Sequence, residues 1–356
     1  MNAPALRASV LVVLLVAGAS AQTLTAEPAR EPQPADPPIR LVAITPLGDD
    51  ATAINAAGEA TLTIGTQAWR FTPTHSNGVG GALSPLGTLG GTISIAAAIN
   101  DAGVATGFST LADGSYRAFL AGEGPMLSLG TLSGDFSSGT GLNAAGQVVG
   151  FAYGSDDNEH GFVWTPEAPG GTTGTMLELG TLGGVYSDAL AVGPTGDVAG
   201  YAYTVAGAFH AFLWHAGHMT DLGTLGGSYS KAEAMDAAGD IVGQAYLPGN
   251  VKAHACLWKG GAPIDLGALN GEYSEALAID PTGKYIVGQA SVPGGPLLQY
   301  HAVLHVAGTL VDLNSLLPAH SGWLLQSAEG VNAAGQIVGQ GVFAGKTRGF
   351  LLTPLL

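Results

Sequence analysis

The sequence predicts an all-β protein, a seven-bladed β-propeller of four-stranded antiparallel blades. Three observations predict it: a phrase that recurs seven times, four short β-like runs in each interval, and apolar residues on both faces of those runs. The phrase, "LGTLGG" or a close variant, begins at Leu86, Leu129, Leu179, Leu222 and Leu266, with weaker forms at Leu47 and Leu313. Successive starts lie 39 to 50 residues apart. Four strands in a period of this length are typical of a propeller blade.

Each repeat contains the same elements in the same order. The repeat after Leu222 reads "AEAMDAAGDIVG", which gives a small-residue strand, a turn from Asp236 to Gly239, and a second strand. An Asn or Asp side chain at the first turn position bonds the backbone two residues on, and Gly at the fourth accepts a left-handed conformation. The same turn is expected in other repeats at Asn100, Asn143, Asp280 and Asn332. The third strand carries "HACLW" and the fourth leads into the next "DLG".

Runs such as "AFLW" and "IVG" are apolar throughout instead of alternating. Blades pack face against face, so both sides of each sheet are buried and continuous apolar runs are expected. Helical repeats would show apolar spacings of three and four, and a membrane barrel would need longer strands with one polar face.

The two ends of the domain complement each other. The last repeat ends at "RGFLLTP" and lacks a fourth strand, whereas "IRLVAITPLG", from Ile39 to Gly48, precedes the first repeat. Pairing this segment beside Phe350 would close the ring and remove two exposed sheet edges. We therefore expect one domain of seven repeats, residues 40–356.

The chain resembles the HAF repeat family, named for a His-Ala-Phe phrase present here at His210, Ala211 and Phe212. The "LGTLGG", "IN-x-x-G-x-VVG" and "HAFLW" elements match that family across nearly the whole chain after the leader, and "DLNSLLPAHSGWLLQSAEGVNAAGQIVGQG" is similar to its closing unit. Local departures are the first repeat, which has "AWRF" and no Gly pair, and Cys256 in place of Phe. The resemblance implies the fold and an exported location, but no reaction.

The first residues predict export. "MNAPALRASVLVVLLVAGASAQ" has one positive charge, a short apolar run and small residues before Gln22, as a cleaved signal peptide over 1–21 would. An uncleaved anchor is the alternative, although the run is short for a membrane span. Residues 22–39 are Pro-rich and predict a disordered linker. No later run is apolar enough to cross a membrane, so we expect an extracellular, cell-surface or periplasmic protein.

The net charge and the cysteine content limit which partner molecules and which cross-links are expected. The formal net charge is −16, and loss of the leader with its one Arg would make it −17. No basic patch is available to release counterions from phosphates, so nucleic acid is excluded as a partner. Cys256 is the only cysteine and forms no internal disulfide. We expect a monomer by default.

Several motifs invite a chemical interpretation and do not support one. The Asx turns offer one oxygen each, whereas a calcium loop needs several at alternate positions. The "LGTLGG" glycines lack the Lys and the helix of a nucleotide loop. Recurring histidines sit on different blades, too far apart for one metal, and should cap strands instead; they are His160, His210, His254 and His301. We expect no catalytic residue, cofactor or metal site, and a solvated loop at "DDNEH", Asp156 to His160.

One recurring pair predicts a binding site. An aromatic residue and a serine follow each Gly pair, at the start of the innermost strand and the mouth of the channel. Their rings and hydroxyls could bind a sugar or a peptide, or the rings could wedge between blades as core. The candidate ligand-binding residues are Phe136, Tyr186, Ser187, Tyr229, Ser230, Tyr273 and Ser274.

These observations favour an exported, non-catalytic binding scaffold whose ligand is a glycan or a protein. The alternatives are a channel-face enzyme, such as a polysaccharide lyase or hydrolase, and a purely structural envelope protein. An enzyme should break the repeat at one place with clustered acidic, His or Lys residues. The residues at the channel mouth are similar from repeat to repeat, with Lys231 and Glu275 as mild exceptions.

Overall fold

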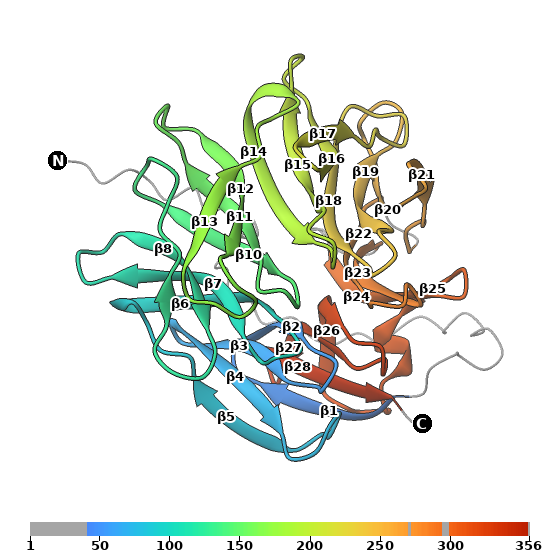
Figure 1. Cartoon of the computed structure of the whole chain (residues 1–356). Coiled ribbons are helices and arrows are strands. Elements are labelled where there is room, and N and C mark those ends of the chain that lie inside the picture. Colours follow the sequence, from blue (N-terminus) through green and yellow to red (C-terminus); the bar gives the residue numbers. More distant parts are fainter. Residues whose placement is uncertain (1–40, 270–271, 294–298, 355–356) are drawn as a thin grey trace. The chain divides into compact units, whose positions relative to one another are not determined.

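The computed structural model describes residues 41–354 except 270–271 and 294–298. These residues belong to one compact unit, Pro38–Leu356. Within them lie 28 strands in seven separate four-stranded sheets, arranged as blades around a central channel (Figure 1). The predicted seven-bladed propeller is confirmed. The predicted leader and linker, residues 1–39, lie outside the described residues.

The sheets follow the repeat, from the inner edge of each blade to its outer edge. The innermost strands of blades 1 to 7 are β2 (Asp50–Ile54), β6 (Gly90–Ile99), β10 (Ser137–Leu142), β14 (Gly183–Val192), β18 (Ser230–Met235), β22 (Ser274–Ile279) and β26 (Trp323–Val331). The second strands are β3 (Ala60–Ile64), β7 (Ala105–Leu111), β11 (Val148–Tyr153), β15 (Val198–Thr204), β19 (Ile241–Tyr246), β23 (Tyr285–Val292) and β27 (Ile337–Phe343). The third strands are β4 (Gln67–Pro73), β8 (Tyr116–Ala121), β12 (Glu159–Pro166), β16 (Phe209–His215), β20 (Ala253–Lys259), β24 (Gln299–Val306) and β28 (Lys346–Pro354). The outer strands are β5 (Gly81–Pro85), β9 (Leu127–Ser128), β13 (Gly174–Glu178), β17 (His218–Asp221), β21 (Ala262–Asp265), β25 (Thr309–Asp312) and, for blade 7, β1 (Leu41–Leu47). One short 3-10 helix, η1 (Leu313–Leu316), follows β25.

The ring is closed by strands from both ends of the chain. β1 pairs antiparallel with β28, and Pro46 lies opposite Phe350 in the register. In Figure 1 the blue β1 lies beside the red β28. Closure by the N-terminal strand is therefore confirmed, and β28 is not left as an exposed edge strand.

The hydrophobic core is divided among the joints between blades. The buried apolar residues of the described chain form seven clusters, and each cluster draws on two neighbouring blades. At the closing joint, Val338 and Leu351 of blade 7 pack with Leu62 and Phe71 of blade 1. Burial on both faces of every sheet explains why the strands are apolar throughout.

Every innermost strand contains a β-bulge against its neighbour in the sheet. In blade 5, Ala232 pairs with Gly243 and Ala234 with Val242, so Glu233 is the extra residue. A Cβ on Gly243 would lie 2.0 Å from the Lys231 carbonyl oxygen, closer than any real contact. This bulge therefore requires the Gly of the "VVG" phrase. A bulge also turns the extra side chain away from the sheet.

No helix among the described residues is long and apolar enough to cross a membrane.

Candidate functional site in the central channel

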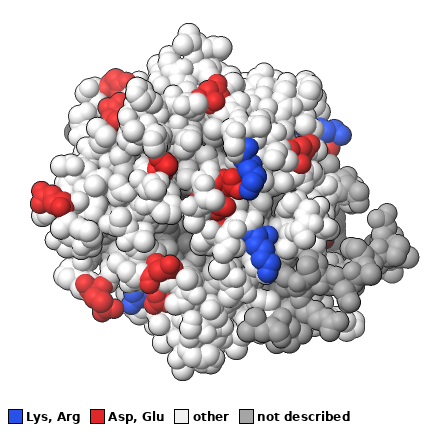
Figure 2. Space-filling view, turned by 45° about the vertical axis from the view of Figure 1, so that its right-hand side comes forward, with Lys and Arg blue, Asp and Glu red and all other residues white. Residues whose placement is uncertain are grey.

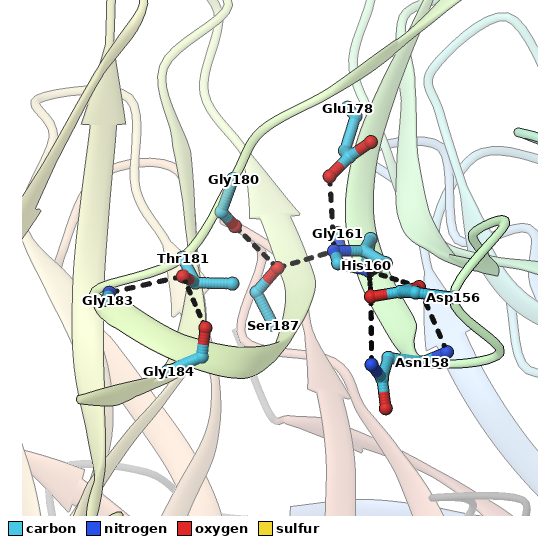
Figure 3. A network of polar contacts seen from close by, with 10 residues as sticks. All are labelled: Asp156, Asn158, His160, Gly161, Glu178, Gly180, Thr181, Gly183, Gly184 and Ser187. Carbon is cyan, nitrogen blue, oxygen red and sulfur yellow. Dashed lines mark hydrogen bonds and ion pairs between the residues drawn. The ribbon is translucent and has the colours of Figure 1, made fainter. Parts of the chain in front are cut away.

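The predicted serines are hydrogen-bonded between blades. Ser187 Oγ accepts from Gly161 N of blade 3 at 2.9 Å and donates to Gly180 O at 2.7 Å (Figure 3). Ser230 and Ser274 make the same two bonds in the next blades. All three are at most 1% exposed. Each hydroxyl donates one bond and accepts one, so its role in this structure is to join blades.

The predicted aromatic residues lie at the face where the innermost strands begin, which we call the entry face. Tyr229 packs between Phe209 and Tyr246, with ring centroids 4.9 and 5.5 Å apart. Tyr186 packs edge-on to Tyr203 at 5.5 Å, and Tyr203 continues the row to Phe209 at 6.0 Å.

The row of rings extends into the neighbouring blades. Phe136 contacts Tyr116 of the preceding blade and Phe151 of its own. Tyr273 lies within electrostatic range of Tyr246 and Tyr300. We call Phe136, Tyr186, Tyr229 and Tyr273, with the rings that they contact, the aromatic rim. Tyr186 is 39% exposed and the other three are half-buried, so the rim both fills the joints and faces solvent.

The aliphatic surface of the entry face adjoins this rim. Val185 is 54% exposed at the start of β14, and Val205 is 86% exposed in the loop between β15 and β16. Val251, in the next blade, is 62% exposed. Together with Tyr186 they place exposed apolar side chains on blades 4 and 5, with the exposed Lys252 beside Val251. Over the face shown in Figure 2 most side chains are uncharged, and Lys or Arg side chains lie beside Asp or Glu side chains near its middle.

The recurring histidines pair with acids of their own blades. His210 Nδ1 lies 2.7 Å from Asp221 of the outer strand, and His254 and His301 make equivalent contacts with Asp265 and Asp312. His160 lies between Asp156 and Glu178 (Figure 3). Each pair ties the third strand of a blade to its outer strand or to the adjacent loop, in agreement with the predicted capping role.

The channel is lined by two positions of each innermost strand. The first position directly follows the serine in blades 2 to 6, and it follows Asp49 in blade 1 and Gln326 in blade 7. In blades 1 to 7 it holds Asp50, Ile95, Ser138, Asp188, Lys231, Glu275 and Ser327. The second, the bulged position, holds Thr52, Ala97, Thr140, Leu190, Glu233, Leu277 and Glu329. Charged residues therefore occur on blades 4 to 7 and 1, whereas blades 2 and 3 contribute neutral ones. The repeat is broken here in one continuous arc.

Lys231 is the cation at the centre of this arc. Its Nζ lies 2.6 Å from Glu233 Oε1 and 5.7 Å from the centre of the Tyr201 ring. Tyr201 in turn donates to Asp188 Oδ2 at 2.5 Å, which links the charged arc to the aromatic rim. Glu275 accepts from Gln289 Nε2 at 3.0 Å, and Glu329 accepts from Ser327 Oγ at 2.5 Å. We call Asp50, Asp188, Lys231, Glu233, Glu275 and Glu329 the channel cluster.

Burial changes the proton affinity of these groups. Desolvation raises the pKa of Glu233 to about 8, although Lys231 opposes the shift, and raises that of Glu329 to about 7. Desolvation likewise raises the pKa of Asp188 to about 6 against the Tyr201 hydrogen bond. Burial disfavours the charge on Lys231, but the neighbouring Glu233, Glu275 and Asp188 outweigh it and raise its pKa. Burial thus favours the protonated forms of Glu233, Glu329 and Asp188, whereas Lys231 keeps its charge.

A hollow of about 240 Å³ occupies the half of the channel beyond the bulges. All seven innermost strands line it, with Glu233 and Glu329 as its only ionisable groups among the residues described. Thr52 and Thr140 also line the hollow, and their hydroxyls donate to the carbonyls of Ala96 and Ala189 in the next blade, at 2.9 and 2.6 Å.

Sequence reasoning missed most of the channel cluster. Lys231 and Glu275 were noticed as exceptions at the channel mouth, but Glu233 and Glu329 were not, because their position is set by a bulge that shifts the alternation of the strand. Aligning the seven repeats on the serine would have shown two columns that vary while their neighbours stay small. No described group of three or more His, Cys, Asp or Glu residues has the arrangement of a metal site.

Comparisons with known proteins extend to the fold. Neither a family model nor a curated protein matches the sequence. Among solved structures, the chain is similar to the β-propeller domain of the trilobed protease from Pyrococcus furiosus, with a TM-score of 0.54 and 9% identity over 85% of this chain and 95% of that one. That domain has an open velcro topology, whereas β1 and β28 close the ring here.

Two weaker similarities point to other proteins. TolB from Acinetobacter baumannii gives a TM-score of 0.47 and 11% identity over 85% of this chain and 78% of that one. A puromycin-hydrolyzing peptidase of Mycobacterium tuberculosis gives 0.49 and 14% over 87% of this chain and 52% of that one. At such identities a structural likeness carries no function. The chain is a seven-bladed β-propeller whose ring is closed by its own two ends.

Proposed function

We propose that this chain is an exported, non-catalytic binding protein of the HAF repeat family that holds a glycan or protein ligand on its entry face. The observation that supports this is the aromatic rim, which runs across successive blades beside the exposed Val185, Tyr186, Val205 and Val251. Partly exposed rings next to exposed apolar side chains suit the faces of sugar rings or the apolar side chains of a peptide. Export is supported by the leader-like residues 1–21.

A glycan array, followed by titration with the best ligand, tests the proposal. We expect Tyr186→Ala to weaken binding by about fivefold, because a lost stacking contact costs on the order of 1 kcal/mol. Phe343→Ala is the matched control for position on the entry face, since Phe343 is also a partly exposed ring of that face but stacks on Trp323 of blade 7 and does not belong to the aromatic rim. Equal affinity of wild type and the Tyr186 variant would refute the assignment of the site.

A channel-face enzyme, such as a polysaccharide lyase or hydrolase, is the second candidate. The channel cluster favours it, because carboxyls with raised pKa values beside a lysine are common at catalytic sites. Incubation with a panel of polysaccharides and analysis of the products would separate the candidates. Product release by wild type that Glu233→Gln abolishes would establish catalysis, whereas binding without product supports the scaffold.

A further inference from the structure

The closure of the ring depends on non-covalent contacts at one joint. β1 belongs to blade 7 by its hydrogen bonds to β28, yet only Gly48 and Asp49 separate it from β2 of blade 1. Blades 7 and 1 therefore cannot move apart unless β1 leaves β28 or this short connection is distorted. Arg348 of β28 adds one ion pair across the joint, 3.0 Å from Asp49.

Negative charge accumulates around this joint on the channel side. Glu329 on the innermost strand of blade 7 interacts with Asp50 of blade 1 and with Glu275 of blade 6, and both interactions are repulsive when all three groups are ionised. Asp50 itself accepts from Thr63 N at 2.7 Å and lies beside Asp49.

Positive charge near the joint is limited. The cations that face these carboxyls are Lys231, which Glu233 also engages, and Arg348, which Asp49 engages. Among the phenols, Tyr201 donates to Asp188, and Tyr246 and Tyr300 interact with Glu275. When all of these carboxyls are ionised, negative charge on blade 7 therefore faces negative charge on blade 1, and these are the two blades that β1 holds together.

We propose that the carboxyl groups of the channel cluster form a proton-operated latch: when protonated they let blades 7 and 1 close, and when ionised they push the two blades apart and release β1. The element with two states is β1, the edge strand of blade 7, which is either paired with β28 or detached from it. An edge strand can detach without unfolding the rest of its sheet. The charges of the channel cluster on β26, β2 and β22 change the free energy of the pairing between β1 and β28.

The direction of the pH dependence follows from the burial of these groups. Desolvation raises the pKa of Glu329 to about 7 and that of Asp50 above its ordinary value of 3.8. A group whose pKa is higher in the closed ring holds its proton more tightly there than in the opened ring. Closure is therefore favoured at acid pH and weakens as the pH rises through about 7.

Hydrogen exchange of the whole protein, followed by mass spectrometry between pH 5.5 and 8.5, tests the latch. After correction for the intrinsic pH dependence of exchange, we expect the protection of peptides from β1 and β28 to fall up to tenfold per pH unit as the pH rises toward 7, which is the linkage of one proton, and to level off above that, where Glu329 is ionised in both states. Peptides from β11, in blade 3, should keep their protection.

Two variants identify the groups. Glu329→Gln should remove most of the extra pH dependence in β1, and Asp50→Asn should reduce it if the first variant fails to fold. Glu123→Gln is the control, because it removes the same charge from a side chain that is 97% exposed, and it should behave as wild type. Constant protection of β1 across the pH range, an equal loss in β11, or an unchanged slope in the folded Glu329 variant would each overturn the proposal.

Discussion

Replacing Asn100 by Asp tests a chain of amides that joins neighbouring blades. Asn100 is 8% exposed, and its Oδ1 accepts from Ala102 N and Val104 N, which closes the turn. Its Nδ2 donates to Asn143 O of the next blade at 3.1 Å. Asp keeps both turn bonds but sets an anionic oxygen against the Asn143 carbonyl.

The cost follows from the bonds that change. Loss of one hydrogen bond costs about 1 kcal/mol, and the desolvated, unpaired carbonyl adds about 1–3 kcal/mol, so we expect unfolding at pH 7 to become easier by about 2–4 kcal/mol. Near pH 4 the new carboxyl begins to take up a proton and can donate, so the loss should shrink. Urea unfolding monitored by tryptophan fluorescence at both pH values measures this.

The reverse exchange is the matched control. Asp236 occupies the equivalent place in blade 5, where its Oδ1 accepts from Ala238 N and Asp240 N but a carboxylate cannot donate. Asp236→Asn should keep the turn and gain stability by up to about 1 kcal/mol. If Asn100→Asp leaves the unfolding free energy unchanged at both pH values, the amides do not join the blades energetically.

Four further predictions concern the same architecture. Gly243→Ala should destabilise by about 3 kcal/mol or more, because the new methyl meets a backbone oxygen, whereas Gly80→Ala, with open space around it, should be neutral in the same urea titration. Ser230→Ala should cost about 1–3 kcal/mol, since it leaves two backbone groups of blade 4 without their partner, and calorimetry would show it as a lower Tm. The unfolding free energy of Glu233→Gln should rise relative to that of wild type by up to about 1.4 kcal/mol per pH unit between pH 5 and 8. The reason is that the folded wild type holds the Glu233 proton up to about pH 8, so its stability falls as the pH rises. Parallel pH profiles of the unfolding free energy would contradict this. Deleting residues 39–47 should lower the melting temperature and promote aggregation through the exposed edge of β28, and an unaltered melting curve would argue against closure by β1.

Most of the fold could be predicted because the same strand and turn motifs occur in each of the seven repeats. The turn at Asn100, the third-strand phrase at His210 and the missing strand beside Phe350 each fix an element whose place depends on local chemistry or on closure. Each is recorded in the sequence by residue type and spacing, so the blade order and the join between the ends could be derived.

The channel could not be predicted in the same way. Glu233 and Glu329 face it because a bulge adds one residue to the strand, and a period-two pattern does not show where the extra residue falls. The amide of Asn100 was interpreted as a turn residue alone, because its second partner belongs to another blade and is invisible within one repeat. Contacts between repeats were thus harder to derive than contacts inside them.

The amides also make the seven joints unequal. Asn332 donates to the Asn55 carbonyl, Asn55 to that of Asn100, Asn100 to that of Asn143, and Asn143 to Gly193 O. Gly193 has no side chain to continue the series, and the following blades carry aspartates at that place. These amides brace the joints from blade 7 round to blade 4, so opening of the joint that β1 closes must also break the bond from Asn332 to Asn55. Blades 5 and 6, which carry Lys231, Glu233 and Glu275, lack such an amide.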